Sequence, residues 1–108
     1  MGADEFLDLL RDRAKGRILY LSHAIERMAC TDRMISTQDV RSVILAGEVI
    51  EKYPNDTRGH GCLMLGRCEN GWALHVVCGP KDEYLAVITA AIPTEGHWDP
   101  GFRRRKEA

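Results

Sequence analysis

His75 is the side chain in this sequence that is best suited to acid–base chemistry. It lies in the apolar run from Trp72 to Cys78, where a histidine costs free energy unless it has a partner or a task. Because imidazole titrates near neutral pH, His75 can act as a general acid or a general base. The alternative is a structural histidine that hydrogen-bonds to the backbone or to a carboxylate, and the sequence leaves both interpretations open.

Two further groups of polar residues have the chemistry to bind phosphate. His23 and Arg27 are spaced i, i+4, so a helix places both side chains on one face, where arginine can grip a phosphate and histidine can carry a proton. A basic cluster near the C-terminus can contact a nucleic-acid backbone; it consists of Arg103, Arg104, Arg105 and Lys106. The alternatives are a solvated helix face and a frayed chain end.

Metal chemistry is not predicted. The chain has four cysteines and four histidines but neither a CxxC nor an HxxxH pair, so the close ligand spacing of a zinc site is missing. We expect no metal and no cofactor; a metal-binding protein is a third alternative, which elemental analysis of the purified protein would test. Cys62, Cys68 and Cys78 fall in apolar strand-like runs, where cysteine acts as a small hydrophobic residue, and we expect reduced thiols.

Length and composition indicate one globular domain over residues 1–108. The chain is 44% hydrophobic and 29% charged, with a net charge of −1, which gives no global attraction to nucleic acid or to membranes. No run approaches the ~18 apolar residues of a membrane span, and the acidic start lacks an export signal pattern. We therefore expect a cytoplasmic protein without a membrane partner. The oligomeric state is left open.

The hydrophobic pattern predicts helices first and strands afterwards. Helices are expected over residues 4–14, 23–31 and from about 37 to Gly47, and strands over 48–53, 62–68, 72–78 and 84–91. Residues 17–21 form a strand or an extended lead-in, and an Asn70-Gly71 turn joins two of the strands. This order predicts an α+β fold in which two to three N-terminal helices pack on an antiparallel sheet of about four strands.

Three local signals refine the helices. In the second helix Ile25, Met28 and Ala29 are expected to face inward. Ser36 followed by Asp39 resembles a capping box at the start of the third helix. Gly47 is expected to end that helix in the left-handed conformation.

Alternation along the strand over 72–78 predicts where His75 points. His75 shares one face with Ala73 and Val77, while the bulkier opposite face meets the helices. His75 should then lie on the more open face of the sheet. There it can meet neighbouring polar residues, namely Arg67, Glu69 or Thr89.

Several motifs together resemble one known family. They are Ser22-His-Ala-x-x-Arg27, Ile35-Ser36-x-x-Asp39-Val40, Gly47-Glu-Val-Ile-Glu51, Tyr53-Pro54, Leu65-Gly66, Leu74-His-Val-Val77 and Ile88-Thr-Ala90. In this order they resemble the bacterial family called domain of unknown function 4258, over roughly residues 19–106. The similarity covers most of the chain.

The resemblance implies a RelE-like fold with a curved antiparallel sheet, similar to small toxins of bacterial toxin–antitoxin systems. Many relatives are encoded beside zinc-finger and helix-turn-helix antitoxins of the kind that partner the MqsR toxin, so such an antitoxin is the implied partner. The family's polar motif residues correspond to His23, Arg27, His75 and Thr89. The family usually has a tyrosine where this chain has Ala91.

The functional expectation is therefore a type II toxin that cleaves RNA without a metal ion. His75 is the candidate base or acid, Arg27 the phosphate clamp and His23 the second proton carrier. The substrate-binding candidates are Thr89, Arg67, Arg103, Arg104 and Arg105. The alternative is a non-catalytic domain that binds a protein or RNA partner, with the histidines as structural groups.

Overall fold

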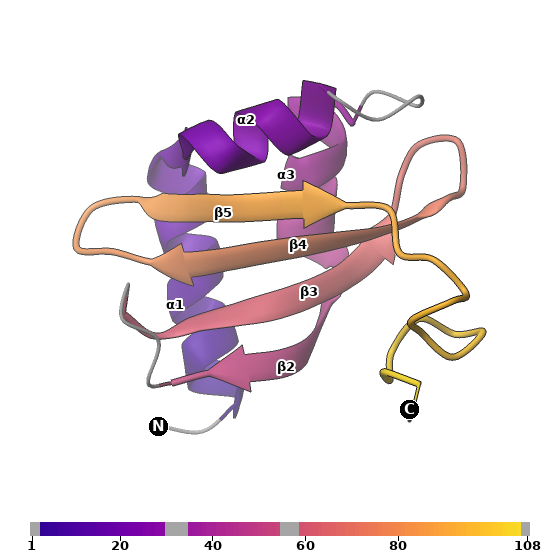
Figure 1. Ribbon diagram of the computed structural model, residues 1–108. Helices are drawn as coiled ribbons and strands as arrows, with labels where there is room; N and C mark the ends of the chain where they lie inside the picture. Colours follow the sequence, from indigo (N-terminus) through magenta and orange to yellow (C-terminus); the bar gives the residue numbers. More distant parts are fainter. Residues whose placement is uncertain (1–2, 30–34, 55–58, 107–108) are drawn as a thin grey trace.

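The chain folds into helices that cover one face of a five-stranded sheet (Figure 1). A computed structural model describes residues 3–29, 35–54 and 59–106. Its elements are α1 (Ala3–Gly16), β1 (Ile18–Tyr20), α2 (Ser22–Ala29), α3 (Thr37–Ala46), β2 (Glu48–Tyr53), β3 (Gly61–Arg67), β4 (Ala73–Pro80) and β5 (Leu85–Ala91). Helices packed on a sheet confirm the predicted α+β class.

The sheet has one more strand than the antiparallel arrangement that was predicted. Its order is β1-β5-β4-β3-β2, and β2 to β5 form an antiparallel meander. The extended segment after α1 becomes β1, which pairs in parallel with β5. The sheet is therefore mixed. A strand is one of the two predicted possibilities for residues 17–21, but three residues carry too little hydrophobic pattern to predict the parallel pairing.

The hydrophobic core lies between the sheet and α1 and α3, which Figure 1 shows behind the strands. Leu74, Val76 and Cys78 of β4 belong to this core, so the bulky face of the strand meets the helices as predicted. Phe6, Leu10 and Ala14 of α1 are buried in the same core.

The buried face of α2 differs from the prediction. Ala24 and Met28 are buried, whereas Ile25 is 56% exposed and Ala29 is exposed as well. Ala24 and Met28 are one turn apart and lie against β5, the main packing partner of this helix. A small alanine allows this close packing, and Ile25 is left outside. The predicted end of this helix, residues 30–31, lies outside the described residues.

The two ends of α3 are held in different ways. Ser36 caps the start, because its hydroxyl accepts a hydrogen bond of 3.0 Å from the Asp39 backbone N–H. At the other end, Gly47 has φ −79° and ψ −170°, so the expected left-handed conformation is wrong. The reason for glycine is space. A Cβ there would lie 2.5 Å from the carbonyl oxygen of Val43 and 2.6 Å from that of Leu65.

The hairpin between β3 and β4 turns at Asn70-Gly71 as predicted. Gly71 has φ +91°, which favours glycine, and its N–H donates to the Cys68 carbonyl at 2.8 Å. Cys62, Cys68 and Cys78 are buried free thiols, as expected. Among the described residues, no helix is long and apolar enough to cross a membrane.

Candidate functional site

The outer face of the sheet, opposite α1 and α3, carries His75 and several of the predicted substrate-binding residues. Leu65 and Ala91 stand directly opposite His75 on the two neighbouring strands, so their side chains share its face. Arg67 is paired with Ala73 and Thr89 with Val77, so each lies one diagonal step from His75. The predicted face is therefore confirmed. Ala91 borders His75 itself.

Glu69 does not neighbour His75 on a strand. It follows β3 in the hairpin, where its backbone N–H donates to the carboxylate of Asp39 at 3.0 Å.

The prediction that His75 lies on an open face is wrong. Residues 94–106, the C-terminal segment, fold back over the sheet, and only 6% of His75 is exposed. Trp98 packs edge-on against the imidazole, with ring centroids 4.4 Å apart. His75 Nε2 donates to the carbonyl oxygen of Phe102 at 2.8 Å. Because a carbonyl only accepts, Nε2 carries hydrogen and Nδ1 is the nitrogen that titrates.

The C-terminal segment is pinned to β2 by two ion pairs. Arg105 donates through Nε and Nη2 to the two carboxylate oxygens of Glu51, at 2.9 and 3.1 Å. Arg103 Nε donates to Glu48 at 2.6 Å. The segment is thus an ordered part of the fold, in place of a frayed chain end.

Phe102, whose carbonyl accepts the hydrogen bond from His75, has a strained backbone conformation. Its φ is +60°, which is uncommon for a bulky residue. Its N–H donates to the Asp99 carbonyl at 2.7 Å within the same turn, and its own carbonyl faces the imidazole. Backbone strain of this kind costs about 1–3 kcal/mol and is typical of functional sites and clamps.

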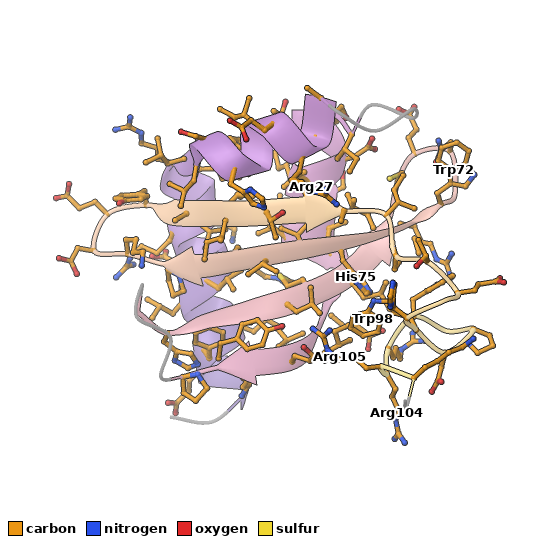
Figure 2. The ribbon with its side chains drawn as sticks, in the orientation of Figure 1. Arg27, Trp72, His75, Trp98, Arg104 and Arg105 are labelled. Carbon is orange, nitrogen blue, oxygen red and sulfur yellow. The ribbon has the colours of Figure 1, made fainter. Side chains whose placement is uncertain are left out.

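Tyr53 and Trp98 complete a polar group that we name the His75 cluster: His75, Glu51, Tyr53, Trp98 and Arg105. The Tyr53 hydroxyl donates to Glu51 Oε1 at 2.7 Å. The Arg105 guanidinium lies 4.7 Å from the centre of the Trp98 ring, at cation–π distance. Figure 2 shows Trp98 and Arg105 gathered beside His75 where the C-terminal segment meets the sheet.

The surroundings set the protonation states of this cluster. The hydrogen bonds that Glu51 accepts from Arg105 hold the pKa of Glu51 below 4.5. Burial lowers the pKa of His75 from 6.5, against the raising effects of the Phe102 carbonyl and Glu51. Burial and the hydrogen bond to Glu51 raise the pKa of Tyr53 to about 12. At neutral pH the cluster therefore holds a carboxylate, a neutral imidazole, a protonated phenol and a guanidinium.

These four groups supply the elements of acid–base chemistry on an anionic substrate. Glu51 and His75 Nδ1 can accept protons, Tyr53 can donate one, and Arg105 carries positive charge. In the present conformation the charges of Glu51 and Arg105 satisfy each other. Across the described residues, no group of three or more His, Cys, Asp or Glu side chains is placed to hold a metal ion.

A cavity of about 520 Å³ lies where the end of α3, β2, β3 and the C-terminal segment meet, and no residue of the His75 cluster lines it. Arg67 and Arg103, two of the predicted substrate-binding residues, both line it. Leu65, which pairs with His75 across the β3–β4 ladder, also lines it, whereas His75 itself does not. The remaining lining residues are Ser42, Ala46, Gly47, Glu48 and Gly66.

The other predicted site residues lie at different places. His23 and Arg27 are exposed on α2, which packs on β5, and the charged groups that act on His75 are Glu51 and Arg105. Figure 2 shows Arg27 on α2 near β5, separate from the group formed by His75, Trp98 and Arg105. Arg104 is exposed and extends away from the sheet.

Sequence reasoning missed Glu51, Tyr53 and Trp98. A local signal existed for the first two, because residues two apart on a strand share a face, and an acid and a phenol at that spacing can hydrogen-bond. Trp98 gave no such signal, since its contact with His75 depends on the path of the C-terminal segment.

Comparison with known proteins identifies a family. No curated protein and no solved structure matched the chain. The sequence pattern described as "Domain of unknown function (DUF4258)" matches residues 20–92, which is more than half of the chain. The match includes α2, α3, β2, β3, β4 and β5, and it leaves out α1 and the C-terminal segment. On this match, the chain belongs to the DUF4258 family.

Proposed function

We propose that this protein is a metal-independent endoribonuclease of the toxin type. The observation that carries the proposal is the His75 cluster, which combines proton acceptors, a proton donor and a cation on one sheet face. The cavity near it, lined by Arg67 and Arg103, is a second support, because arginine is well suited to bind phosphodiester groups. Arg103 would exchange its ion pair with Glu48 for the substrate.

In the proposed reaction, His75 Nδ1 takes the proton of a ribose 2′-hydroxyl. The 2′-oxygen then attacks the adjacent phosphorus, and the bond from phosphorus to the 5′-oxygen breaks. The leaving oxygen receives a proton from a second carrier, and Tyr53 is the candidate within the His75 cluster, because His23 lies apart from the cluster on α2. The products are a 2′,3′-cyclic phosphate and a free 5′-hydroxyl, so no metal ion or other reactant is needed.

Cations must balance the charge that builds on the phosphate during this reaction. Arg105 is the candidate within the cluster, and it would exchange its bond to Glu51 for the substrate. Arg27 lies apart on α2, where it could only contact a more distant part of the RNA. Arg67, Arg103, Arg104 and Thr89 would hold the flanking RNA. The C-terminal segment covers His75, so substrate entry requires Trp98 and Phe102 to move away from the imidazole.

The same burial favours a second candidate function. His75 is almost fully covered and its Nε2 is satisfied by Phe102, which is also what an anchoring residue requires. In that case the protein is a non-catalytic domain that binds a protein or RNA partner, and His75 fastens the C-terminal segment.

A glutamine at position 75 separates the two functions. The amide of His75→Gln can still donate to the Phe102 carbonyl, but it cannot transfer a proton. Wild type, His75→Gln and His97→Gln are induced in bacterial cells, and the purified proteins are incubated with single-stranded RNA in the presence of a chelator. The exposed His97 serves as the matched control.

The nuclease proposal expects growth arrest and 2′,3′-cyclic phosphate ends with wild type and His97→Gln, and neither with His75→Gln. Folding of each variant is checked by its melting temperature. Equal activity of His75→Gln and wild type, or no cleavage by a folded wild type, would refute it and favour the anchoring role.

A toxin also requires an antitoxin, and we propose a zinc-finger and helix-turn-helix protein for that part. The neighbouring open reading frame tests this. A short protein with two CxxC pairs, whose co-expression restores growth, supports the proposal, and unchanged growth arrest in its presence contradicts it.

A further inference from the structure

A second polar cavity lies on the helix side of the protein, at the edge strand β1. Its volume is about 360 Å³, within the range of about 300–1,000 Å³ that is usual for small-molecule sites. The end of α1, strand β1 and the start of α3 form its walls. The lining residues are Ala14, Lys15, Gly16, Arg17, Ile18, Tyr20, Thr37, Gln38 and Arg41.

Three cations line this basic pocket, and no described lining residue is acidic. Lys15, Arg17 and Arg41 are all exposed, and none forms an ion pair with a carboxylate in the described part of the chain. The chain as a whole has a net charge of −1, so this concentration of positive charge is local.

The side chains of other arginines already form hydrogen bonds or ion pairs within the protein. Arg11 donates to the carbonyls of Ile44 and Gly47 at the end of α3. Arg103 and Arg105 are paired with glutamates. The side chains of the basic pocket thus differ from these in having their donors available to a ligand.

Neutral polar groups line the same pocket as the three cations. Tyr20, Thr37 and Gln38 present a phenol, a hydroxyl and an amide, and the Tyr20 hydroxyl donates to the Thr37 carbonyl at 3.4 Å. Donors of this kind, next to arginine and lysine, match the oxygens of a phosphate ester.

We infer that the basic pocket binds a phosphate-bearing ligand through Lys15, Arg17 and Arg41. None of these residues belongs to the His75 cluster or to the cavity near it, so this inference does not depend on the proposed nuclease activity. The phosphate can belong to a small nucleotide or to an RNA backbone, and the two sources share the recognition chemistry.

The test measures binding to the full-length protein by isothermal titration at about 0.15 M salt, where weak contacts between exposed charges are largely screened. The probes are inorganic phosphate, adenosine 5′-monophosphate and a short single-stranded RNA. The variants are Arg41→Gln and Arg17→Gln. Lys52→Gln on β2 is the control, because it removes the same charge at an exposed position outside the pocket.

Loss of one charged donor should weaken binding about tenfold or more in each pocket variant, and Lys52→Gln should bind as wild type does. Binding of phosphate and the mononucleotide identifies a small ligand, whereas binding of RNA alone identifies the backbone of a nucleic acid; both support the inference. Absence of binding by all three probes overturns it, as does binding that folded Arg41→Gln and Arg17→Gln leave unchanged. Cleavage activity enters none of these readouts.

Discussion

Acidification below pH 6.5 is expected to destabilise the protein through His75. The folded environment lowers the pKa of His75 from its ordinary value of 6.5, so the unfolded chain binds a proton more readily than the folded chain. The stabilising contribution of neutral His75 is therefore complete above pH 6.5. It is lost as the pH falls from 6.5 through the folded pKa, and it changes no further below that value.

The magnitude follows from the linkage between proton uptake and folding. One proton taken up only on unfolding lowers the free energy of unfolding by about 1.4 kcal/mol for each pH unit, as an upper limit. Two charged groups act on His75 within the cluster: Glu51 favours the imidazolium and Arg105 disfavours it. Glu51 itself titrates below 4.5, so its own window lies at lower pH.

Urea denaturation of wild type and His75→Gln between about pH 8 and pH 5 measures this contribution. The two proteins should show different pH slopes of unfolding free energy below 6.5 and parallel slopes above it. Both proteins contain the other histidines, so the contributions of those histidines to the pH dependence cancel in the comparison. Parallel slopes over the whole range would refute the argument that burial disfavours the imidazolium of His75.

Three further changes test the packing and the cluster. Gly66→Ala should cost about 1–3 kcal/mol, because its Cβ would lie 2.8 Å from Val43 Cγ2; an unchanged melting temperature would contradict this contact. Glu51→Gln should lower the pKa of Tyr53 from about 12 toward 10.0, measured by the absorbance of the phenolate, and an unshifted titration would argue against their hydrogen bond. Ser36→Ala should cost about 0.5–2 kcal/mol by loss of the α3 cap, read from urea unfolding, and Ser36→Thr serves as the conservative control.

Features that depend on neighbouring residues could be predicted from the sequence. The Ser36 cap, the Asn70-Gly71 turn and the inward side of β4 each rest on spacings of two to four residues. Backbone geometry fixes such spacings before any tertiary contact forms. The same short spacings gave the order of helices and strands, and this order predicted the α+β class.

Features set by distant contacts could not be predicted in the same way. Ile25 is exposed because Ala24 and Met28 approach β5. In a short helix with several apolar residues, the spacing of these residues does not determine which side of the helix faces the sheet. His75 is buried because the C-terminal segment returns across the sheet. Only the paths of β2 and this segment bring Glu51 and Arg105 together.

The parallel pairing of β1 with β5 also has a consequence for how the domain is made. A ribosome releases β1 before the strands of the meander, so β1 has no partner until β5 emerges. Until then the meander ends at β4, an apolar strand whose backbone hydrogen-bonding groups are open to another chain. A fragment trimmed to residues 20–92, the limits of the family match, would lose α1 and nearly all of β1. That fragment would carry a bare strand edge and would be prone to aggregation, whereas the longer chain closes this edge itself.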